Sequence, residues 1–246
     1  MTIGRTLRPL ACVLALLALQ PTASAKVTVK KGYDISPTGL RPTYPSNYKC
    51  SPLTSLYASW IDVDGARRDE VHSGIDGGRL GEPVLAPAPG TVRAVWKANW
   101  QWGDEGALLI RHKREDLNLD KGPPFYYSAF YHLKYDDVKT YKAGQRIKRG
   151  QTLAKVFRPG GKSMYLPEVH LEVYEVWDDD ALTWNINKYG APDWDNHTGK
   201  LIDPLYLMAL HAPPSDDVHV EVKPFDQDFD FNDFAGFSYI LPCRKR

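Results

Sequence analysis

From about Ser55 onward, the sequence consists of short apolar runs that glycine and proline interrupt every few residues. Short runs bounded by turn-forming residues are typical of β-strands, and many of them in succession indicate an antiparallel sheet. No segment shows the sustained periodicity of a long helix. We therefore predict an all-β fold, an antiparallel sheet of barrel or sandwich type, with strands near residues 84–86, 91–96, 107–110, 125–131, 152–156 and 169–173.

We assign the predicted domain to residues 55–210. Three segments lack this pattern of short apolar runs: two flank the domain and one lies within it. Residues 26–54 mix lysine, proline, glycine and tyrosine, and we expect an extended N-terminal arm packed on the domain. Residues 178–200 are polar and tryptophan-rich, which predicts a long loop insertion, whereas residues 204–210 could form a short helix. The C-terminal tail, residues 211–246, places phenylalanines among aspartates. It is either a strand that closes on the domain or a mobile segment.

The N-terminus has the three parts of a secretory signal peptide in the expected order. Arg5 and Arg8 supply the positive charge, residues 10–19 form a short apolar stretch, and residues 23–25 (Ala-Ser-Ala) form a small-residue cleavage site. We predict that the signal peptide spans residues 1–25 and that the mature protein is periplasmic or secreted. No apolar run reaches the roughly 18 residues of a membrane span, so we expect none after signal removal.

The charge of the chain argues against one class of partner. Its 31 basic and 30 acidic side chains nearly balance. Domains that bind nucleic acids normally carry a basic excess or a basic stripe. We therefore expect no nucleic-acid partner.

Export also changes the interpretation of the three cysteines. Cys12 leaves with the signal peptide, and Cys50 and Cys243 remain. Two cysteines in an exported protein suggest one disulfide. The bridge would tie the N-terminal arm to the C-terminal tail, and the alternative is two unpaired thiols.

Two of the seven histidines lie in informative settings with a carboxylate nearby in the sequence. His72 precedes Asp76 by four residues, and the glycines around them disfavour a helix that would bring the two side chains together. In an extended segment the two residues would lie roughly 13 Å apart. The chain must therefore bend if both are to reach one ion, and Gly74 permits such a bend.

The second histidine, His170, lies in a segment that alternates strictly between polar and apolar residues. On a strand, Glu168, His170, Glu172 and Tyr174 would share one face, while the valines and leucine between them would pack into the core. Two histidines and one aspartate suit a catalytic zinc ion, because they leave a fourth position for water. By spacing alone, a structural role for these histidines remains the more common alternative.

The motifs around these residues resemble those of the lysostaphin/LytM-like zinc metallopeptidases. Residues 72–76 are similar to the family's H-x-G-x-D motif, and residues 170–173 are similar to its final H-F-E-V. Between them, in the family's order, come segments similar to P-V-x-A-x-x-x-G-x-V, to Tyr-His-Leu and to G-x-x-V-x-x-G-x-x-L, at residues 83–92, 131–133 and 144–153.

The resemblance implies a small antiparallel β fold with zinc as the cofactor in a groove across the sheet. By matching positions, it implies that His72, Asp76 and His170 are the zinc ligands and that His132 is a catalytic histidine outside the ligand set. His112 matches a strand histidine that is not a ligand. The family cleaves peptide bonds in bacterial peptidoglycan, so the resemblance implies a peptidoglycan peptide as the substrate.

The sequence departs from the family's pattern at Glu168, where the family usually has a second catalytic histidine. In an alternative register, His170 would be catalytic and Glu172 would be the ligand, but the residues after His170 would then lose their match. We expect Glu168 to act as a general base, as carboxylates do in other zinc proteases. The alternative is a weakened or inactive enzyme.

These observations leave three functions to weigh. The first is a secreted zinc endopeptidase that hydrolyses peptide cross-links of peptidoglycan, with His132 and Glu168 as its catalytic residues. The second is a catalytically weak or inactive module of the same fold that binds the cell wall or regulates another wall hydrolase. The third is a biotinyl or lipoyl carrier, and the absence of a modifiable lysine at a suitable turn argues against it.

Overall fold

The structure is a computed structural model that describes residues 27–28, 34–98, 104–158, 166–186, 192–194, 199–209 and 219–246. The predicted signal peptide, residues 1–25, lies outside these residues and stays a prediction. None of the helices in the described ranges is long and apolar enough to cross a membrane.

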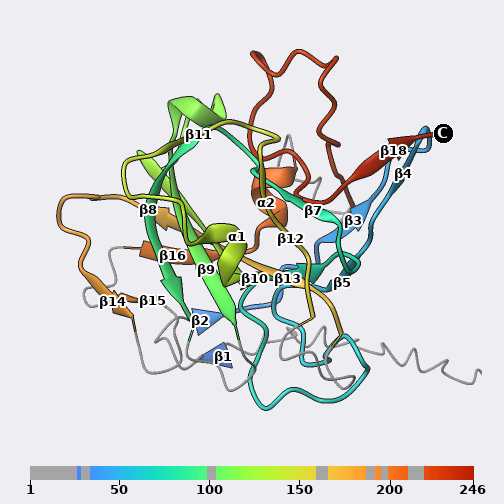
Figure 1. The fold of residues 1–246 in the computed structure, drawn as a ribbon, viewed down its shortest axis with the longest axis horizontal. Coiled ribbons are helices and arrows are strands. Elements are labelled where there is room, and N and C mark those ends of the chain that lie inside the picture. The colour runs from blue at the N-terminus through green and yellow to red at the C-terminus, as the bar shows by residue number, and fades with distance from the viewer. Residues whose placement is uncertain are drawn as a thin grey trace, which may run out of the picture.

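An eight-stranded sheet forms the body of the molecule (Figure 1). Its strands run in the order β11-β8-β9-β10-β13-β6-β5, β16 pairs with β13 off this path, and every pairing in the sheet is antiparallel. The predicted all-β class is therefore confirmed. The strands span β5 (Leu53–Ser55), β6 (Ile75–Gly77), β8 (Gly90–Lys97), β9 (Glu105–Lys113), β10 (Phe125–Lys134), β11 (Arg146–Ile147), β13 (Val169–Val176) and β16 (Gly199–Ile202).

Smaller elements surround this sheet. The helices are a 3-10 turn η1 (Glu115–Leu117), α1 (Tyr135–Val138) and α2 (Leu205–Met208), and α2 confirms the predicted short helix. Figure 1 shows the sheet curving around α2, which belongs to the same core as the central strands. The remaining strands pair two by two: β1 (Val27–Thr28) with β2 (Asp34–Ile35), β3 (Arg41–Thr43) with β17 (His219–Glu221), β4 (Tyr48–Cys50) with β18 (Cys243–Lys245), β7 (Pro83–Leu85) with β12 (Thr152–Lys155), and β14 (Trp184–Ile186) with β15 (Pro192–Trp194).

The central strands are buried on both faces. On β9, Leu108 and Ile110 belong to one core cluster, whereas Ala107 and Leu109 belong to a second cluster on the opposite face. A strand that is covered on both faces appears in the sequence as a continuous apolar run. This is why the strand near residues 107–110 was visible in the sequence without any alternation.

The predicted long loop at residues 178–200 is only partly a loop. Strands β14 and β15 pair antiparallel within it, and β16 begins at Gly199. Asp179 anchors its start, because it accepts hydrogen bonds from the Tyr127 hydroxyl and from Arg111, whose Nη1 lies 2.5 Å away. The segment is therefore a strand-bearing insertion tied to the central sheet.

The C-terminal tail closes on the domain, which decides between the two predicted states. β17 pairs with β3 in parallel, an exception to the expected antiparallel arrangement, and β18 pairs antiparallel with β4. Phe237, Tyr239 and Leu241 are fully buried in the main core. In the described part of the tail, the chain thus contributes to the domain's own core.

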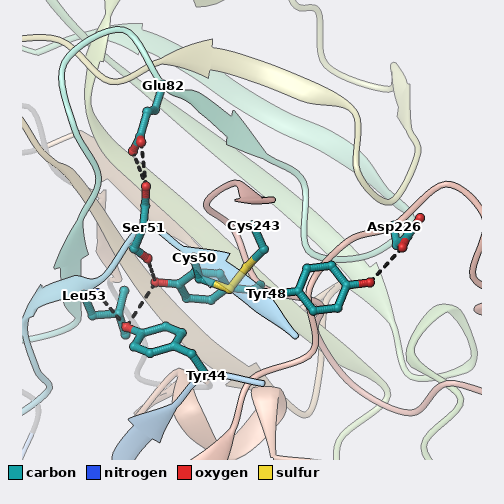
Figure 2. The surroundings of a disulfide bond; sticks show 9 residues. Tyr44, Tyr48, Cys50, Ser51, Leu53, Glu82, Asp226 and Cys243 are labelled. Atoms are coloured by element: carbon teal, nitrogen blue, oxygen red, sulfur yellow. Dashed lines mark hydrogen bonds between the residues drawn. A yellow bond between two sulfur atoms is a disulfide. The ribbon is translucent and has the colours of Figure 1, made fainter. Parts of the chain in front are cut away.

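A disulfide joins Cys50 on β4 to Cys243 on β18, as predicted from the sequence. The two residues are directly opposite each other in the strand register (Figure 2). Around the bridge, the Tyr239 hydroxyl donates to the Ser51 carbonyl at 2.6 Å, and Tyr48 donates to Asp226 at 2.8 Å. The arm and the tail are therefore joined by one covalent bond and by hydrogen bonds on both sides of it.

Replacing both cysteines, as in Cys50→Ser with Cys243→Ser, should lower the free energy of unfolding by about 2–5 kcal/mol. The bridge spans 193 residues of sequence, so its loss restores much chain entropy to the unfolded state. Urea denaturation of the oxidised wild type and of the double variant measures the difference. Each single variant should lose nearly as much stability as the double variant, and unchanged unfolding midpoints in all three would contradict the prediction.

His112 on β9 is a buried structural histidine, in agreement with its expected place outside the ligand set. Its Nδ1 donates to the Pro89 carbonyl at 2.7 Å, and its Nε2 accepts from the Ser128 hydroxyl at 2.8 Å. Burial lowers its pKa from 6.5 to about 4, which outweighs the opposing effect of the bond to Pro89. The imidazole is therefore neutral in the folded protein over the physiological pH range.

This histidine should make folding stability depend on pH. Between pH 6.5 and pH 4 the unfolded chain takes up a proton at His112 and the folded chain does not, so stability falls as the pH falls. The full effect of this one group is about 3 kcal/mol. Urea denaturation of wild type and His112→Gln at pH 7 and pH 4.5 should show the stability difference shrinking by most of that amount. Parallel pH profiles for the two proteins would contradict the assignment.

Candidate metal centre

Pairing of β6 with β13 brings the predicted ligands together. In this register Asp76 lies directly opposite His170. His72 reaches the same place because the chain before β6 passes close over β13. A Cβ atom on Gly74 would lie 2.1 Å from the Leu171 carbonyl oxygen, so only glycine fits at this point. The bend expected at Gly74 is therefore present.

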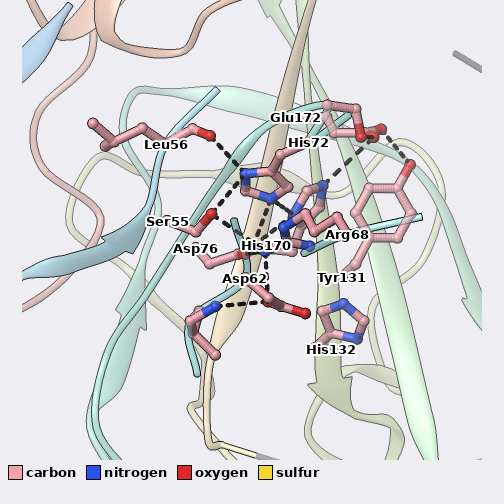
Figure 3. A network of polar contacts seen from close by, with 12 residues as sticks. Ser55, Leu56, Asp62, Arg68, His72, Asp76, Tyr131, His132, His170 and Glu172 are labelled. Carbon is pink, nitrogen blue, oxygen red and sulfur yellow. Dashed lines mark hydrogen bonds and ion pairs between the residues drawn. The ribbon is translucent and has the colours of Figure 1, made fainter. Parts of the chain in front are cut away.

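Three ligand-type atoms of these residues form a compact triangle (Figure 3). His170 Nδ1 is 2.7 Å from Asp76 Oδ1, and His72 Nε2 is 3.0 Å from each of these two atoms. All three side chains are buried, and they are the one such group of potential metal ligands among the described residues. Tetrahedral zinc with bonds of about 2.0–2.1 Å places its ligand atoms about 3.3 Å apart. The donor set and its spacing therefore fit zinc after a small expansion.

Neighbouring groups orient His72 and Asp76 toward this centre. His72 Nδ1 lies 2.8 Å from the Leu56 carbonyl and must donate to it, which leaves the Nε2 lone pair facing the centre. Asp76 Oδ2 accepts a hydrogen bond from Arg68 at 2.8 Å, so Oδ1 is the oxygen that faces the histidines. Each ligand-type atom is thus fixed by a contact on the far side of its own side chain.

Glu172 orients His170 toward the centre in a similar way. Its carboxylate lies 3.5 Å from His170 Nε2, on the side of the ring away from Asp76. Three hydroxyl groups donate to this carboxylate, those of Ser73 and Tyr174 at 2.5 Å and that of Tyr131 at 3.0 Å. Glu172 therefore orients His170 through the Nε2 side of the ring, opposite the ligand-type atom Nδ1. This geometry favours the register with His170 as the ligand over the alternative with Glu172.

The electrostatics of the three side chains are strongly coupled. Burial lowers the pKa of His72. Burial also acts to raise the pKa of Asp76, but the two histidines outweigh burial and hold it well below its usual value. Burial acts to lower the pKa of His170, yet its hydrogen bonds to Asp76 and Glu172 raise it to about 9. Asp76 is therefore an anion, as a metal ligand must be.

A β-bulge in β10 places His132 next to the three ligand-type side chains. Between Phe130 and Leu133, three steps along β10 face two steps along β9, and His132 has a left-handed φ of 57°. Because of the extra residue, Phe130 and Leu133 both point into the main core, and His132 lies between them in the bulge. Its ring centroid lies 6.0 Å from that of His170 (Figure 3).

His132 Nδ1 lies 3.2 Å from Glu105 Oε1 at the start of β9. Burial acts to lower the pKa of His132, but the hydrogen bond to Glu105 and the charges of Glu105 and Glu168 raise it above its usual value. These contacts thus shift the imidazole toward its protonated, hydrogen-bond-donating form relative to an exposed histidine.

Glu168 lies just before β13, where it forms a bridge with Phe157. It borders a pocket with Leu80, Leu166 and Pro167, and its Oε2 atom is buried and has no hydrogen-bond partner among the described residues. Burial and the charge of Asp76 raise its pKa to about 7, although His132 and His170 oppose them. The carboxylate is therefore within electrostatic reach of the centre and outside the ligand triangle.

Residues 70–183 match peptidase family M23. The chain contains an M23 peptidase domain. The family expected from the sequence motifs is thereby confirmed, and the M23 domain holds every residue predicted for the site: His72, Asp76, His132, Glu168 and His170.

Several solved structures are similar to this chain. A zinc-containing peptidase from Vibrio cholerae is 24% identical, and the alignment covers 59% of this chain and 41% of the other, with a TM-score of 0.36. The catalytic domain of lysostaphin from Staphylococcus simulans is 21% identical, with coverage of 52% and 80% and a TM-score of 0.31. A mutant catalytic domain of the prophage-encoded M23 protein EnpA from Enterococcus faecalis is 22% identical, with coverage of 55% and 87% and a TM-score of 0.35. No curated protein matches the chain.

Sequence reasoning missed the residues that hold the M23 domain's site in place. Arg68, Glu105 and Tyr131 contact the ligands or His132 directly. Glu172 was expected on the face of His170, but not as its orienting partner. The alternation of residues 168–174 was the signal for Glu172, and the Tyr-His-Leu motif contained Tyr131 without indicating its contact with His170; Arg68 and Glu105 had no signal of either kind.

Proposed function

We propose that the protein is a zinc-dependent endopeptidase that hydrolyses peptide cross-links of bacterial peptidoglycan outside the cytoplasm. The observation that carries this proposal is the buried triangle of His72, Asp76 and His170 inside an M23 domain. Members of this family are endopeptidases that cleave peptidoglycan. The export signal read from residues 1–25 and the Cys50–Cys243 disulfide support action in an oxidising compartment.

His72 Nε2, Asp76 Oδ1 and His170 Nδ1 would hold the zinc ion. When bound, zinc supplies a Lewis acid that polarises a carbonyl group and activates water near neutral pH. Arg68 and Glu172 keep the ligand-type atoms aimed at one point, and this orientation limits the freedom that metal binding must remove. The buried environment also strengthens every charge interaction at the site.

The remaining side chains act on the substrate and its proton. His132, protonated and hydrogen-bonded to Glu105 through Nδ1, presents Nε2 as a donor to the oxygen on which negative charge develops. Glu168 accepts the proton that the attacking water loses and returns it to the leaving amine. Its raised pKa suits both steps, because the carboxyl group gains and loses a proton near neutral pH. These roles make Glu168 the functional counterpart of the histidine that the resembled family usually has.

Digestion of purified peptidoglycan tests this proposal. The mature, zinc-loaded protein should release new amino termini from at least one cross-link type, and His132→Ala should release far fewer at the same zinc content. Wall sacculi that differ in their cross-links should be compared, because they show which bond is cut. If the zinc-loaded protein binds sacculi and cleaves none of them, the non-catalytic wall-binding or regulatory function replaces the proposal.

A further inference from the structure

Glu105 is a fully buried carboxylate next to the proposed catalytic residues. It begins β9 and pairs in register with Lys134, two residues beyond His132. Its Oε1 lies 3.2 Å from His132 Nδ1. Its Oε2 is buried and has no hydrogen-bond partner among the described residues. The contact with His132 is therefore the interaction through which this carboxylate acts.

A carboxylate in such a place is costly for folding. Burying an ionised group costs several kcal/mol unless a charged partner and hydrogen bonds compensate it. Among the described residues only one of the two oxygens has a partner, so an apolar residue of similar size would serve the fold at least as well. The stability of the fold therefore does not account for a carboxylate at this buried position, whereas an interaction with His132 does.

His132 needs such a partner because its backbone gives it an unusual direction. It lies in the β-bulge with a φ of 57°, a conformation that residues other than glycine adopt at some cost. An imidazole that donates from Nδ1 has its Nε2 on the opposite side of the ring, available for a second interaction. The group that accepts the Nδ1 proton therefore sets the orientation of the ring, and with it the direction in which the Nε2–H of the protonated ring points.

We propose that Glu105 is a positioning residue of the peptidase reaction, which accepts the Nδ1 proton of His132 and so presents Nε2 of that ring to the substrate oxygen. This inference rests on the proposed function, because it assigns Glu105 a role through His132. It adds a carboxylate 27 residues upstream of His132 to the site, in a segment with no motif of its own.

Two substitutions of Glu105 separate positioning from folding. Glu105→Leu removes the acceptor and the buried charge, and Glu105→Gln keeps one acceptor oxygen. In the zinc-loaded protein on soluble cross-linked peptides, Glu105→Leu should lower kcat by roughly 10- to 1,000-fold, and Glu105→Gln should lower it less. KM, zinc content and the unfolding midpoint should stay near their wild-type values. Glu175→Gln, a partly buried strand carboxylate that pairs with Tyr126 away from the site, is the matched control and should leave kcat unchanged.

Two further measurements test whether Glu105 affects kcat through His132. In ¹⁵N spectra of histidine-labelled protein, assigned with His132→Ala, wild-type His132 should show a protonated Nδ1. Glu105→Leu should shift that signal toward the unprotonated form. Glu105→Leu should also cost little further activity when it is added to His132→Ala, because residues that act as a unit are not additive.

Two results would overturn the inference. One is a folded, zinc-loaded Glu105→Leu protein with wild-type kcat. The other is an unchanged His132 spectrum in that variant. If the wild-type protein cleaves no wall peptide at all, the proposed function fails, and the link between Glu105 and His132 is then decided by the spectrum alone.

Discussion

His72→Ala should leave the purified protein without its single equivalent of bound zinc and without peptidase activity. His72 is one of three buried ligand-type side chains that converge on one point, and no fourth such residue joins them in the described part of the chain. Removing it leaves two protein ligands, where catalytic zinc sites normally have three. Metal analysis after chelation, reloading and gel filtration should fall from about one equivalent to near zero.

His219→Ala is the matched control, because His219 is an exposed histidine on β17. It should keep both the zinc and the activity. Asp76→Asn provides a second route to the same result with little change in volume, in case His72→Ala folds poorly. Equal zinc content in wild type, His72→Ala and Asp76→Asn would show that this triangle does not bind the metal.

The strands of the central sheet could be predicted because burial on both faces makes them dense apolar runs. The predicted strand at residues 125–131 begins where β10 begins, but β10 continues to Lys134. The extension follows from the bulge at His132, which keeps Leu133 on the same face as Phe130, although strict alternation would place it on the opposite face with Tyr131. A bulge changes which residues face the core without leaving a pattern in the sequence.

The candidate ligands could be predicted from residue type and motif, and their convergence could not. It depends on the register that sets Asp76 opposite His170, a pairing of strands far apart in the sequence. The orienting contacts of Arg68 and Glu105 depend in the same way on the folded arrangement. A single sequence contains residue types and local spacing, and the positioning of a site is mostly non-local.

The tail and the insertion were the least predictable parts. β17 and β3 are separated by most of the chain and pair through three residues each. Such short strands have no periodicity to recognise. In contrast, the disulfide was predictable, because export leaves two cysteines and only one way to pair them within the chain.

Glu168→Gln should slow peptidoglycan hydrolysis by roughly 10²–10⁴-fold and leave zinc binding intact. The amide has the size of the carboxylate but cannot accept the proton of the attacking water. Glu168 lies outside the ligand triangle, so His72, Asp76 and His170 should retain the metal. Release of amino termini from sacculi, measured at equal zinc occupancy, gives the two rates.

Two further variants show whether a slower rate is specific to proton transfer at Glu168. Glu115→Gln removes an exposed carboxylate from η1 and should digest sacculi at the wild-type rate. Glu168→His introduces the residue that the resembled family usually has at this position and should retain far more activity than Glu168→Gln, because imidazole can also accept a proton near neutral pH. If Glu168→Gln digests as fast as wild type, Glu168 has no part in proton transfer. His132 would then be the one catalytic side chain of those predicted from the sequence, and its pairing with Glu105 would have to support the proton transfers as well as the developing charge.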